Sequence, residues 1–332
     1  NSPNALEGNK TENTANAAFQ SSEAGMVDVV AQEDELLESI RTLVSILPAN
    51  NEDDMSYSEC TDDLNRACTD LEASVADPAL SLPMISDDNF FFEVKKDYAK
   101  DMVTGFIRLN GNTIGAIANR TALYDEEGKE AETFDGTLSA EGAEKAAEFV
   151  NFCDAFSIPV LTLTNVTGYK ATKCQEKRIA KAAAKLIYAF HDMTAPKVNV
   201  IVGAANGTAS LAMNNSADMT YAWPQATIGM MDPVSAAKIM YADEIAKADD
   251  KNALISEKAA AYAKLQPSAE SAAKTALSLR KLQDRSLQQH LRCCSQRERT
   301  VRQRSTVPFN PETQYRVNTS RINDPLCVYG VE

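Results

Sequence analysis

The stretch KVNVIVGAANGTASLAM, residues 197–213, has the composition of a strand that runs directly into the first turn of a helix. Its first half is rich in β-branched residues, and small residues follow at the point where the helix would begin. The first N–H groups of a helix have no partner inside the helix and carry partial positive charge. The stretch therefore predicts a backbone site for an anion, either a phosphate or an oxyanion.

A second loop that could carry chemistry is TNVTGYKATKCQEKR, residues 164–178, which follows the apolar run PVLTLTN. Loops after the carboxyl ends of parallel strands are the usual ligand sites of α/β sheets, so both loops are candidates. The acids and bases available are Glu176, Asp232 and His191. His191 follows a helical run and Asp232 precedes a proline, so helix-end and helix-cap roles explain both without catalysis.

Metal chemistry is not predicted. The cysteines are scattered at 60, 68, 153, 174, 293, 294 and 327, no C-x-x-C pair occurs, and there are only two histidines. A zinc site needs a closer set of such ligands. Without a secretory signal, we expect free thiols in a reducing compartment and a cytoplasmic location. Cys153 lies in an amphipathic run and is expected to be a small buried hydrophobe.

The charge of the chain restricts its partners. A net charge of −14 lacks the basic face that general nucleic-acid binding needs. No apolar run approaches the roughly 18–20 residues that cross a bilayer, and the missing initiator Met suggests a processed or incomplete chain. The sign of the charge reverses in the segment from Arg280 to Arg304, which contains eight Lys or Arg and only two acids. Residues 276–332 are therefore expected to be an atypical basic tail: disordered, mis-framed, or an arm for a polyanion.

Hydrophobic periodicity predicts the elements that position the two loops. Residues 26–48 predict a short strand and an amphipathic helix, and residues 51–92 an acidic linker running over a surface. The sequence LNGN at 109–112, between apolar alternating runs, predicts a hairpin. A helix at 139–158 with Ser139 as its cap, a strand, an Ala-rich helix and the strand at 197–203 follow. This alternation predicts an α/β sheet with crossover helices.

Five separated motifs follow one another along the chain: VTGFIRLNGNTIGAIANR (103–120), SAEGAEKAAEFVNFCDAFSIPVLTLTNVTGY (139–169), AKLIYAF (184–190), PKVNVIV (196–202) and ADMTYAWPQATIGMM (217–231). These motifs resemble the beta-type carboxyltransferase subunits of biotin-dependent acyl-CoA carboxylases and decarboxylases. The resemblance runs through about residues 93–270, with the motifs in family order and at near-family spacing. The segment 1–50 resembles the end of the family's N-terminal domain, and 51–92 its connecting segment.

The resemblance implies a crotonase-like α/β fold of β-β-α spirals, with a near-complete C-terminal domain at 93–275 after the end of an N-terminal domain at 1–50. Active sites of the family form between domains of different subunits, so a homo-oligomer is expected, dimer-based and up to hexameric. The implied partners are a biotin carboxyl carrier protein or domain and other carboxylase or decarboxylase subunits. The implied cofactor is biotin on that separate carrier, and the implied substrate an acyl-CoA such as acetyl-, propionyl- or methylmalonyl-CoA, without a metal.

The implied reaction moves a carboxyl group between biotin and the α-carbon of the acyl-CoA through an enolate. Backbone N–H groups stabilise the developing oxyanions, so no protein side chain need act as the base. By its place in the family's motif, the segment Gly207, Thr208 and Ala209 is expected to form the backbone hole for the biotin ureido oxygen. The pocket for substrate or biotin is expected to include Gly168, Tyr169, Gln175, Glu176 and Asn206.

The sequence also departs from the family's pattern. Asn206 and Ser210 replace tyrosines, and the Gly-Gly motif that serves the thioester carbonyl has no counterpart in this chain. The Gly-Tyr-Val-Asp strand expected after Ala276 is likewise absent. Two alternatives therefore stay open: a non-catalytic scaffold subunit of the same fold, and another crotonase-like CoA-thioester enzyme. In the second loop the departures are Asn165, Thr167, Ala171 and Thr172.

Overall fold

The structure is a computed structural model that describes residues 16–265 and 279–281, apart from residues 52, 54–56, 64, 65, 67, 69, 70, 126, 215 and 249. The chain divides into two compact units, Asn1–Ser295 and Gln296–Glu332. The second unit lies outside the described residues, so all the elements below belong to the first.

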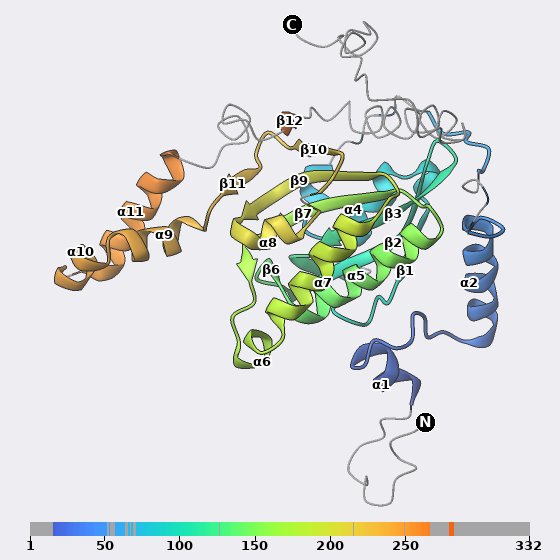
Figure 1. Cartoon of the computed structure of the whole chain (residues 1–332), viewed down its shortest axis with the longest axis horizontal. Coiled ribbons are helices and arrows are strands. Elements are labelled where there is room, and N and C mark those ends of the chain that lie inside the picture. The colour runs from blue at the N-terminus through green and yellow to red at the C-terminus, as the bar shows by residue number, and fades with distance from the viewer. Residues whose placement is uncertain are drawn as a thin grey trace, which may run out of the picture. The chain divides into compact units, whose positions relative to one another are not determined.

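Helices and strands alternate through the central part of this unit (Figure 1). The helices are α1 (Ala17–Ser22), α2 (Glu33–Ile46), α3 (Leu71–Ser74), α4 (Pro78–Ile85), the 3₁₀ helix η2 (Asp87–Asn89), α5 (Ala140–Ala155), α6 (Lys173–Glu176), α7 (Ile179–Asp192), α8 (Gly207–Ala212), α9 (Pro233–Met240), α10 (Ala242–Lys247) and α11 (Lys251–Leu265). The strands are β1 (Phe91–Val94), β2 (Met102–Leu109), β3 (Asn112–Asn119), β4 (Ala122–Tyr124), β5 (Glu130–Thr133), β6 (Thr137–Leu138), β7 (Val160–Val166), β8 (Gly168–Tyr169), β9 (Lys197–Asn206), β10 (Met219–Ala222), β11 (Thr227–Gly229) and β12 (Leu279–Lys281).

The main sheet has the strand order β1-β2-β3-β7-β9-β10-β12, and β11 also pairs with the end of β9. The pairs β1–β2 and β2–β3 are antiparallel, and every later pair in this sheet is parallel. Parallel neighbours need a crossover, which α5 supplies before β7 and α7 supplies before β9. The predicted α/β sheet with crossover helices is therefore confirmed.

The hairpin between β2 and β3 is also confirmed. Asn110 and Gly111 have φ values of 54° and 76°, so both central residues of the turn are left-handed. This is the two-residue turn whose twist matches that of the flanking strands, and Asn-Gly suits it best. Gly111 is required for a second reason, since an added Cβ would overlap the carbonyl oxygen of Ser58.

Apolar layers cover both faces of the sheet. In Figure 1, α5 and α7 lie side by side over one face, and their buried residues pack with Phe106 of β2 and Ile117 of β3. Leu82 and Ile85 of α4 pack on the other face, where Tyr221 also lies. The neighbouring strand residues alternate between the two layers, as the period of two in a strand requires. The predicted cap is confirmed, because Ser139 accepts a hydrogen bond from the amide of Gly142 at the start of α5.

Two expectations about the N-terminal third are wrong. No strand forms at residues 26–30, which lead toward α2 and make two backbone hydrogen bonds, from Met26 N to the carbonyl of Gln20 and from Lys95 N to the carbonyl of Asp28. The segment 51–92 does not run over the surface throughout, because α4 is buried in the core. The acidic residues on either side of α4 concealed it, and every residue of α4 except Ser81 is apolar, so no amphipathic helical period appears. At the other end, β12 pairs with β10 beyond the expected boundary at 275, and residues 282–332 of the basic tail lie outside the described residues.

Candidate functional site

The junction between β9 and α8 has an irregular backbone. Asn206 is extended, with φ −109° and ψ 132°, whereas Gly207 has φ +59°, in the left-handed region that favours glycine. A Cβ at Gly207 would lie 2.8 Å from the carbonyl oxygen of Met230, which follows β11. Both the backbone angle and the close approach of a second backbone segment therefore exclude a side chain at this position.

The first turn of α8 is suited to donating backbone hydrogen bonds. The non-glycine residues with positive φ do not include Thr208, so this residue can follow Gly207 without strain. The side chain of Asn206 does not cap the helix, and the first amides of a helix have no acceptor inside it. Thr208 is exposed while Ala209 is buried, so the turn lies at the protein surface with its far side anchored in the core. Such a turn can stabilise an oxyanion.

Tyr169 lies beside this turn. Its hydroxyl donates a hydrogen bond of 3.1 Å to the carbonyl oxygen of Thr208, which links the loop after β7 to the start of α8. The short strand β8, Gly168–Tyr169, holds the tyrosine by pairing in parallel with β6. The structure thus brings Gly168 and Tyr169 to the segment Asn206–Ala209, as the sequence predicts for residues that share a site.

Gln175 faces a different neighbour. Its Oε1 accepts a 2.7 Å hydrogen bond from the amide of Ala140, and its Nε2 donates one of 2.6 Å to Glu141. Burial acts to raise the pKa of Glu141, but the hydrogen bond from Gln175 and the charge of Arg178 outweigh it, so this pKa is lowered. Gln175 therefore joins α6 to the start of α5, and its amide is occupied there rather than at the α8 turn.

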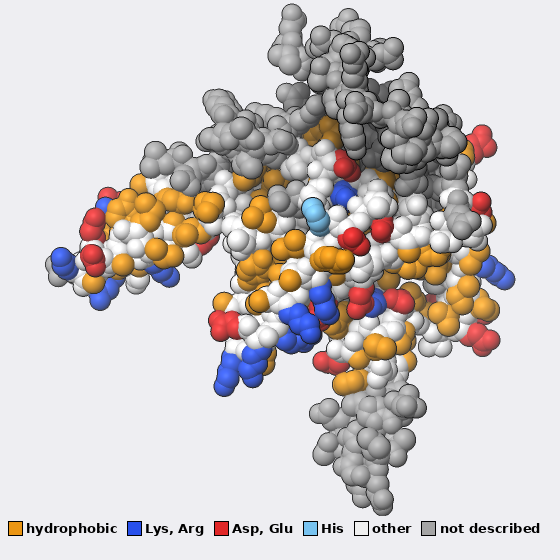
Figure 2. All heavy atoms as spheres, viewed as in Figure 1, with side chains coloured by type: hydrophobic (Ala, Val, Ile, Leu, Met, Phe, Trp, Pro, Cys, Tyr) orange, Lys and Arg blue, Asp and Glu red, His pale blue; other side chains and the backbone are white. Residues whose placement is uncertain are grey.

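Glu176 is exposed at the end of α6, among basic side chains. Figure 2 shows Lys and Arg side chains gathered over the α6 and α7 region of the viewed face. A solvated carboxylate in such a setting is not held in one orientation, so it does not have the geometry of a general base. The exposed basic residues of these two helices and their connection are Lys173, Lys177, Arg178, Lys181 and Lys185.

The candidate acids, bases and metal ligands have structural roles or lie exposed in the part of the chain that the structure describes. Within the described residues, no group of three or more His, Cys, Asp or Glu could hold a metal ion. His191 lies exposed in the last turn of α7, and Asp232 caps α9 by accepting hydrogen bonds from the amide of Ser235. In the part of the chain that the structure describes, no helix is both long and apolar enough to span a bilayer.

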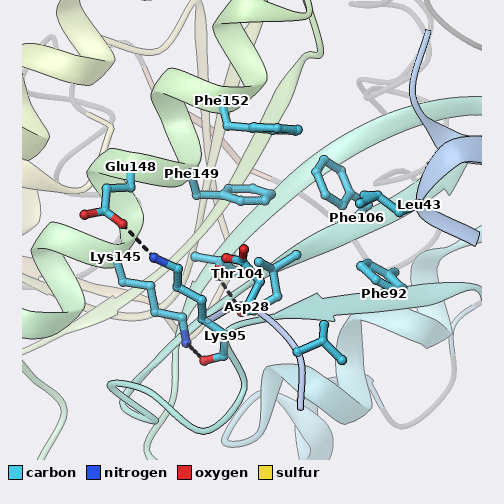
Figure 3. A pocket seen from close by; sticks show the side chains of 12 residues that line it. Asp28, Leu43, Phe92, Lys95, Thr104, Phe106, Lys145, Glu148, Phe149 and Phe152 are labelled. Carbon is cyan, nitrogen blue, oxygen red and sulfur yellow. Dashed lines mark hydrogen bonds and ion pairs between the residues drawn. The ribbon is translucent and has the colours of Figure 1, made fainter. Parts of the chain in front are cut away.

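A cavity of about 270 Å³ lies elsewhere, between the N-terminal segment and the β1–β2 face (Figure 3). Three of the charged groups that line it are engaged within the protein: Lys95 pairs with Glu148 at 2.7 Å, and the Nζ of Lys145 donates to the carbonyls of Lys95, Tyr98 and Met102. No residue predicted for the site lines this cavity. Its apolar wall is formed by Val29, Leu43, Phe92, Val94, Phe106, Phe149 and Phe152.

A buried cluster of charges stands behind this cavity. Arg120 pairs with Asp77 at 2.9 Å, and both side chains are 3% exposed; its second contact is with Glu93 at 3.6 Å. Burial raises the pKa of Glu93, against the charges of Arg120 and Lys145, and burial lowers the pKa of Lys145 to about 7. Asp77 also caps α4 and accepts a hydrogen bond from the amide of Tyr124, so the cluster joins α4 to the sheet.

The structural importance of Asn119 and Asn165 was not predicted from the sequence. Asn165 departs from the family pattern, and its side chain contacts the backbone of β9. Asn119 ends β3, is 5% exposed and hydrogen-bonds Asn165. The available signal was a pair of amides at the ends of two buried apolar strands, where an unpaired polar group would be costly.

Comparison with known proteins connects this geometry to one family. A model of the carboxyl transferase domain matches residues 5–306. The carboxyltransferase subunit of a propionyl-CoA carboxylase from Haloferax mediterranei is 38% identical over 232 residues, which are 67% of this chain and 43% of that protein. The methylmalonyl-CoA carboxyltransferase 12S subunit from Propionibacterium freudenreichii subsp. shermanii is 36% identical over 251 residues, 72% of this chain and 46% of that protein.

Similar solved structures belong to the same class of protein. A transcarboxylase 12S structure with hydrolysed methylmalonyl-coenzyme A bound has a TM-score of 0.76 at 30% identity, over 95% of this chain and 62% of that one. These neighbours are carboxyltransferases of crotonase-like fold, which confirms the predicted fold class. The chain spans about half the length of the curated relatives it matches. With a family match over most of its length, the chain belongs to the carboxyl transferase domain family.

Proposed function

We propose that this chain forms part of a carboxyltransferase that moves a carboxyl group between biotin and the α-carbon of an acyl-CoA. The observation that carries the proposal is the β9–α8 junction, where a left-handed Gly207 opens a surface turn of backbone amides. Relatives described as propionyl-CoA carboxylase and methylmalonyl-CoA carboxyltransferase subunits favour a short acyl-CoA, of the propionyl or methylmalonyl class. The proposed arrangement has the end of an N-terminal domain at 1–50, a connection at 51–92 and the C-terminal domain at 93–275.

The turn has the features that a ureido oxygen requires. Gly207 has no Cβ, so the carbonyl oxygen of Met230 can approach it closely. The amides of Gly207, Thr208 and Ala209 would hold the oxygen by hydrogen bonds, and the polar side chains of Asn206 and Tyr169 border the same place. Biotin, when bound, supplies the carboxyl group and the nitrogen that exchanges it.

The role of this chain is then electrostatic. Hydrogen-bond donors that are fixed before the reaction stabilise negative charge as it develops, without reorganising during the step. Backbone amides at the start of a helix meet this requirement because their orientation is set by the fold. Tyr169 adds to this orientation, since its hydroxyl holds the carbonyl of Thr208 on the side away from the donors. No protein base is needed in this scheme, because the backbone donors stabilise the negative charge.

The proposal also names partners. Biotin would be presented by a separate carrier protein or domain, and the chain would work in a homo-oligomer with other carboxylase or decarboxylase subunits. The related transcarboxylase 12S forms a hexamer assembly and belongs to a multienzyme core, which supports an oligomeric arrangement for this chain as well.

The test is carboxyl transfer from methylmalonyl-CoA to free biotin by the native assembly, which removes the need for a carrier. Thr208→Pro deletes one amide donor at a helical position where proline is tolerated. We expect it to lower kcat by about 10²–10³-fold, the usual effect of losing one oxyanion donor. Thr208→Ala keeps the amide and is the matched control, expected within about threefold of the wild-type rate.

Circular dichroism and thermal unfolding of both variants would show that the fold is retained. A wild-type protein that transfers no carboxyl group to biotin from any short acyl-CoA would contradict the proposed activity. A Thr208→Pro variant that folds and transfers at the wild-type rate would contradict the assignment of the hole to this turn.

A further inference from the structure

The ends of three adjacent parallel strands lie next to the α8 turn. In the main sheet β3, β7 and β9 are consecutive neighbours, and their carboxyl ends meet at one edge. Asn119 is the last residue of β3, and Asn165 is the last residue but one of β7. Ala204 lies at the corresponding level of β9, two residues before Asn206.

The pairing between β7 and β9 is interrupted at this level. Thr164 pairs with Ile201 and Val166 pairs with Ala205, so on the β7 side the three residues 202–204 of β9 stand opposite the single residue Asn165. Extra residues in one strand form a bulge, which bends that strand and leaves backbone groups without their ladder partner. The bulge therefore changes the direction of β9 just before the turn into α8.

The side chain of Asn165 fills the interruption. Its Oδ1 accepts a 2.9 Å hydrogen bond from the amide of Ala204, which the bulge has removed from the regular ladder. Gly203 makes room for this side chain, because a Cβ there would overlap Oδ1 and would lie 2.7 Å from Cγ. An amide carbonyl thus replaces the strand partner that the backbone of β7 does not provide.

Asn119 holds Asn165 in turn. The Oδ1 of Asn119 accepts a 3.1 Å hydrogen bond from the backbone amide of Asn165, and its Nδ2 lies 3.9 Å from the sulfur of Met213. Met213 is the residue that follows α8. Asn119 and Asn165 therefore contact the chain on both sides of α8, at Ala204 before it and at Met213 after it.

We propose that Asn165 and Asn119 are positioning residues that fix the bulge of β9 and, through it, the direction in which the amides of the α8 turn point. The inference rests on the proposed function, since it assigns these side chains to the same oxyanion hole. Neither side chain needs to touch the substrate. They hold the end of β9 in the bulged conformation, so that the strand leaves its regular pairing with β7 and the chain turns at Gly207.

The variants separate the hydrogen bond from side-chain volume. Asn165→Leu keeps the approximate shape but removes the acceptor for Ala204, and Asn165→Asp restores a carboxylate oxygen as acceptor. Asn119→Ala removes the side-chain oxygen that accepts the hydrogen bond from the backbone amide of Asn165. The matched control is Asn112→Ala, because Asn112 is a buried asparagine on the same strand but at its opposite end, with 7% exposure against 5% for Asn119.

The first readout is hydrogen exchange of the amides at residues 204–210 in the native assembly, with no substrate present. Loss of the Asn165 acceptor should speed exchange there by about tenfold, which corresponds to one net hydrogen bond. Asn165→Asp should stay near the wild-type rate, and the Asn112→Ala control should leave this segment unchanged. Equal exchange in Asn165→Leu and wild type would overturn the inference.

The second readout is carboxyl transfer to free biotin. A misdirected turn should lower kcat by about 10- to 100-fold, since small displacements of fixed groups have such effects, while the KM for the acyl-CoA stays within about twofold. Uniform loss of stability without a change in kcat would overturn the positioning role. If wild type shows no transfer at all, the proposed function fails, and the exchange experiment still decides whether the two asparagines hold the bulge.

Discussion

Replacing Gly207 by alanine tests the geometry on which the site depends. The substitution adds one methyl group at a residue with φ +59°, 2.8 Å from the carbonyl oxygen of Met230. A left-handed φ costs an L-residue about 1–2 kcal/mol relative to glycine. The contact is about 0.6 Å shorter than ordinary van der Waals distance, so the backbone near Met230 or the α8 turn must also move. Part of this cost is offset by about 0.4–1 kcal/mol, because alanine has less freedom than glycine in the unfolded chain.

The expected net loss in the free energy of unfolding is about 1–3 kcal/mol. Alanine substitutions at two other glycines allow the contributions to this loss to be measured separately. Gly128 has φ +75° with no atom within 4 Å of an added Cβ, so Gly128→Ala reports the backbone angle alone. Gly168 has open space and no positive φ, so Gly168→Ala reports only the effect on the unfolded chain.

Urea unfolding of the three variants gives these terms, provided that the m value stays constant. We expect Gly168→Ala to be neutral or slightly stabilising, Gly128→Ala to lose about 1 kcal/mol, and Gly207→Ala to lose more than either. Transfer to free biotin should fall by about 10²-fold in Gly207→Ala, because the turn has to move. A Gly207→Ala protein as stable as Gly168→Ala, with unchanged transfer, would refute both the left-handed turn and the hole built on it.

Two further predictions concern the buried charges. Between pH 7 and 10.5 the unfolded chain binds a proton at Lys145 that the folded chain does not, so the free energy of unfolding should rise by about 2 kcal/mol from pH 7 to 9. Urea unfolding of wild type and Lys145→Met across this pH range checks the prediction. The same pH dependence of the unfolding free energy in both proteins would contradict it. Arg120→Ala leaves Asp77 and Glu93 buried without their cation, so it should cost about 3–5 kcal/mol at pH 7. A loss under 1 kcal/mol in the same assay would show that water reaches this cluster.

Local sequence signals predicted the parts of the fold that local interactions determine. The Asn-Gly turn, the Ser139 cap and the strand–helix order depend on neighbours along the chain, and all three are confirmed. Cys153 was expected to be buried and is 0% exposed, since an amphipathic run alone indicates the inward face. The helix α4 was not predicted because its burial comes from packing against β1, β2 and β3, and no pattern within residues 78–85 indicates that packing.

The candidate site was predictable only in part, for the same reason. The strand-to-helix junction is a local pattern, so composition predicts it within residues 197–213, and the family resemblance implies Gly207–Ala209 as its donors. The direction of Gln175 could not be predicted, because its partners Ala140 and Glu141 lie on another helix. The bulge of β9 was equally hidden, since it depends on which strand pairs with which and on the side chain of Asn165.

The proposed hole consists of backbone amides, and this decides which departures from the family pattern matter. A hole made from backbone amides places no demand on the side chains of Thr208 or Ser210, provided that the backbone keeps its course. The demand falls instead on Gly203 and Gly207, where another group occupies the space of a Cβ. Substitutions at the first pair therefore change what borders the proposed hole, whereas a side chain at either glycine would displace the groups that shape it. The serine at 210 is thus compatible with the proposed carboxyl transfer, which an alanine at either glycine should slow.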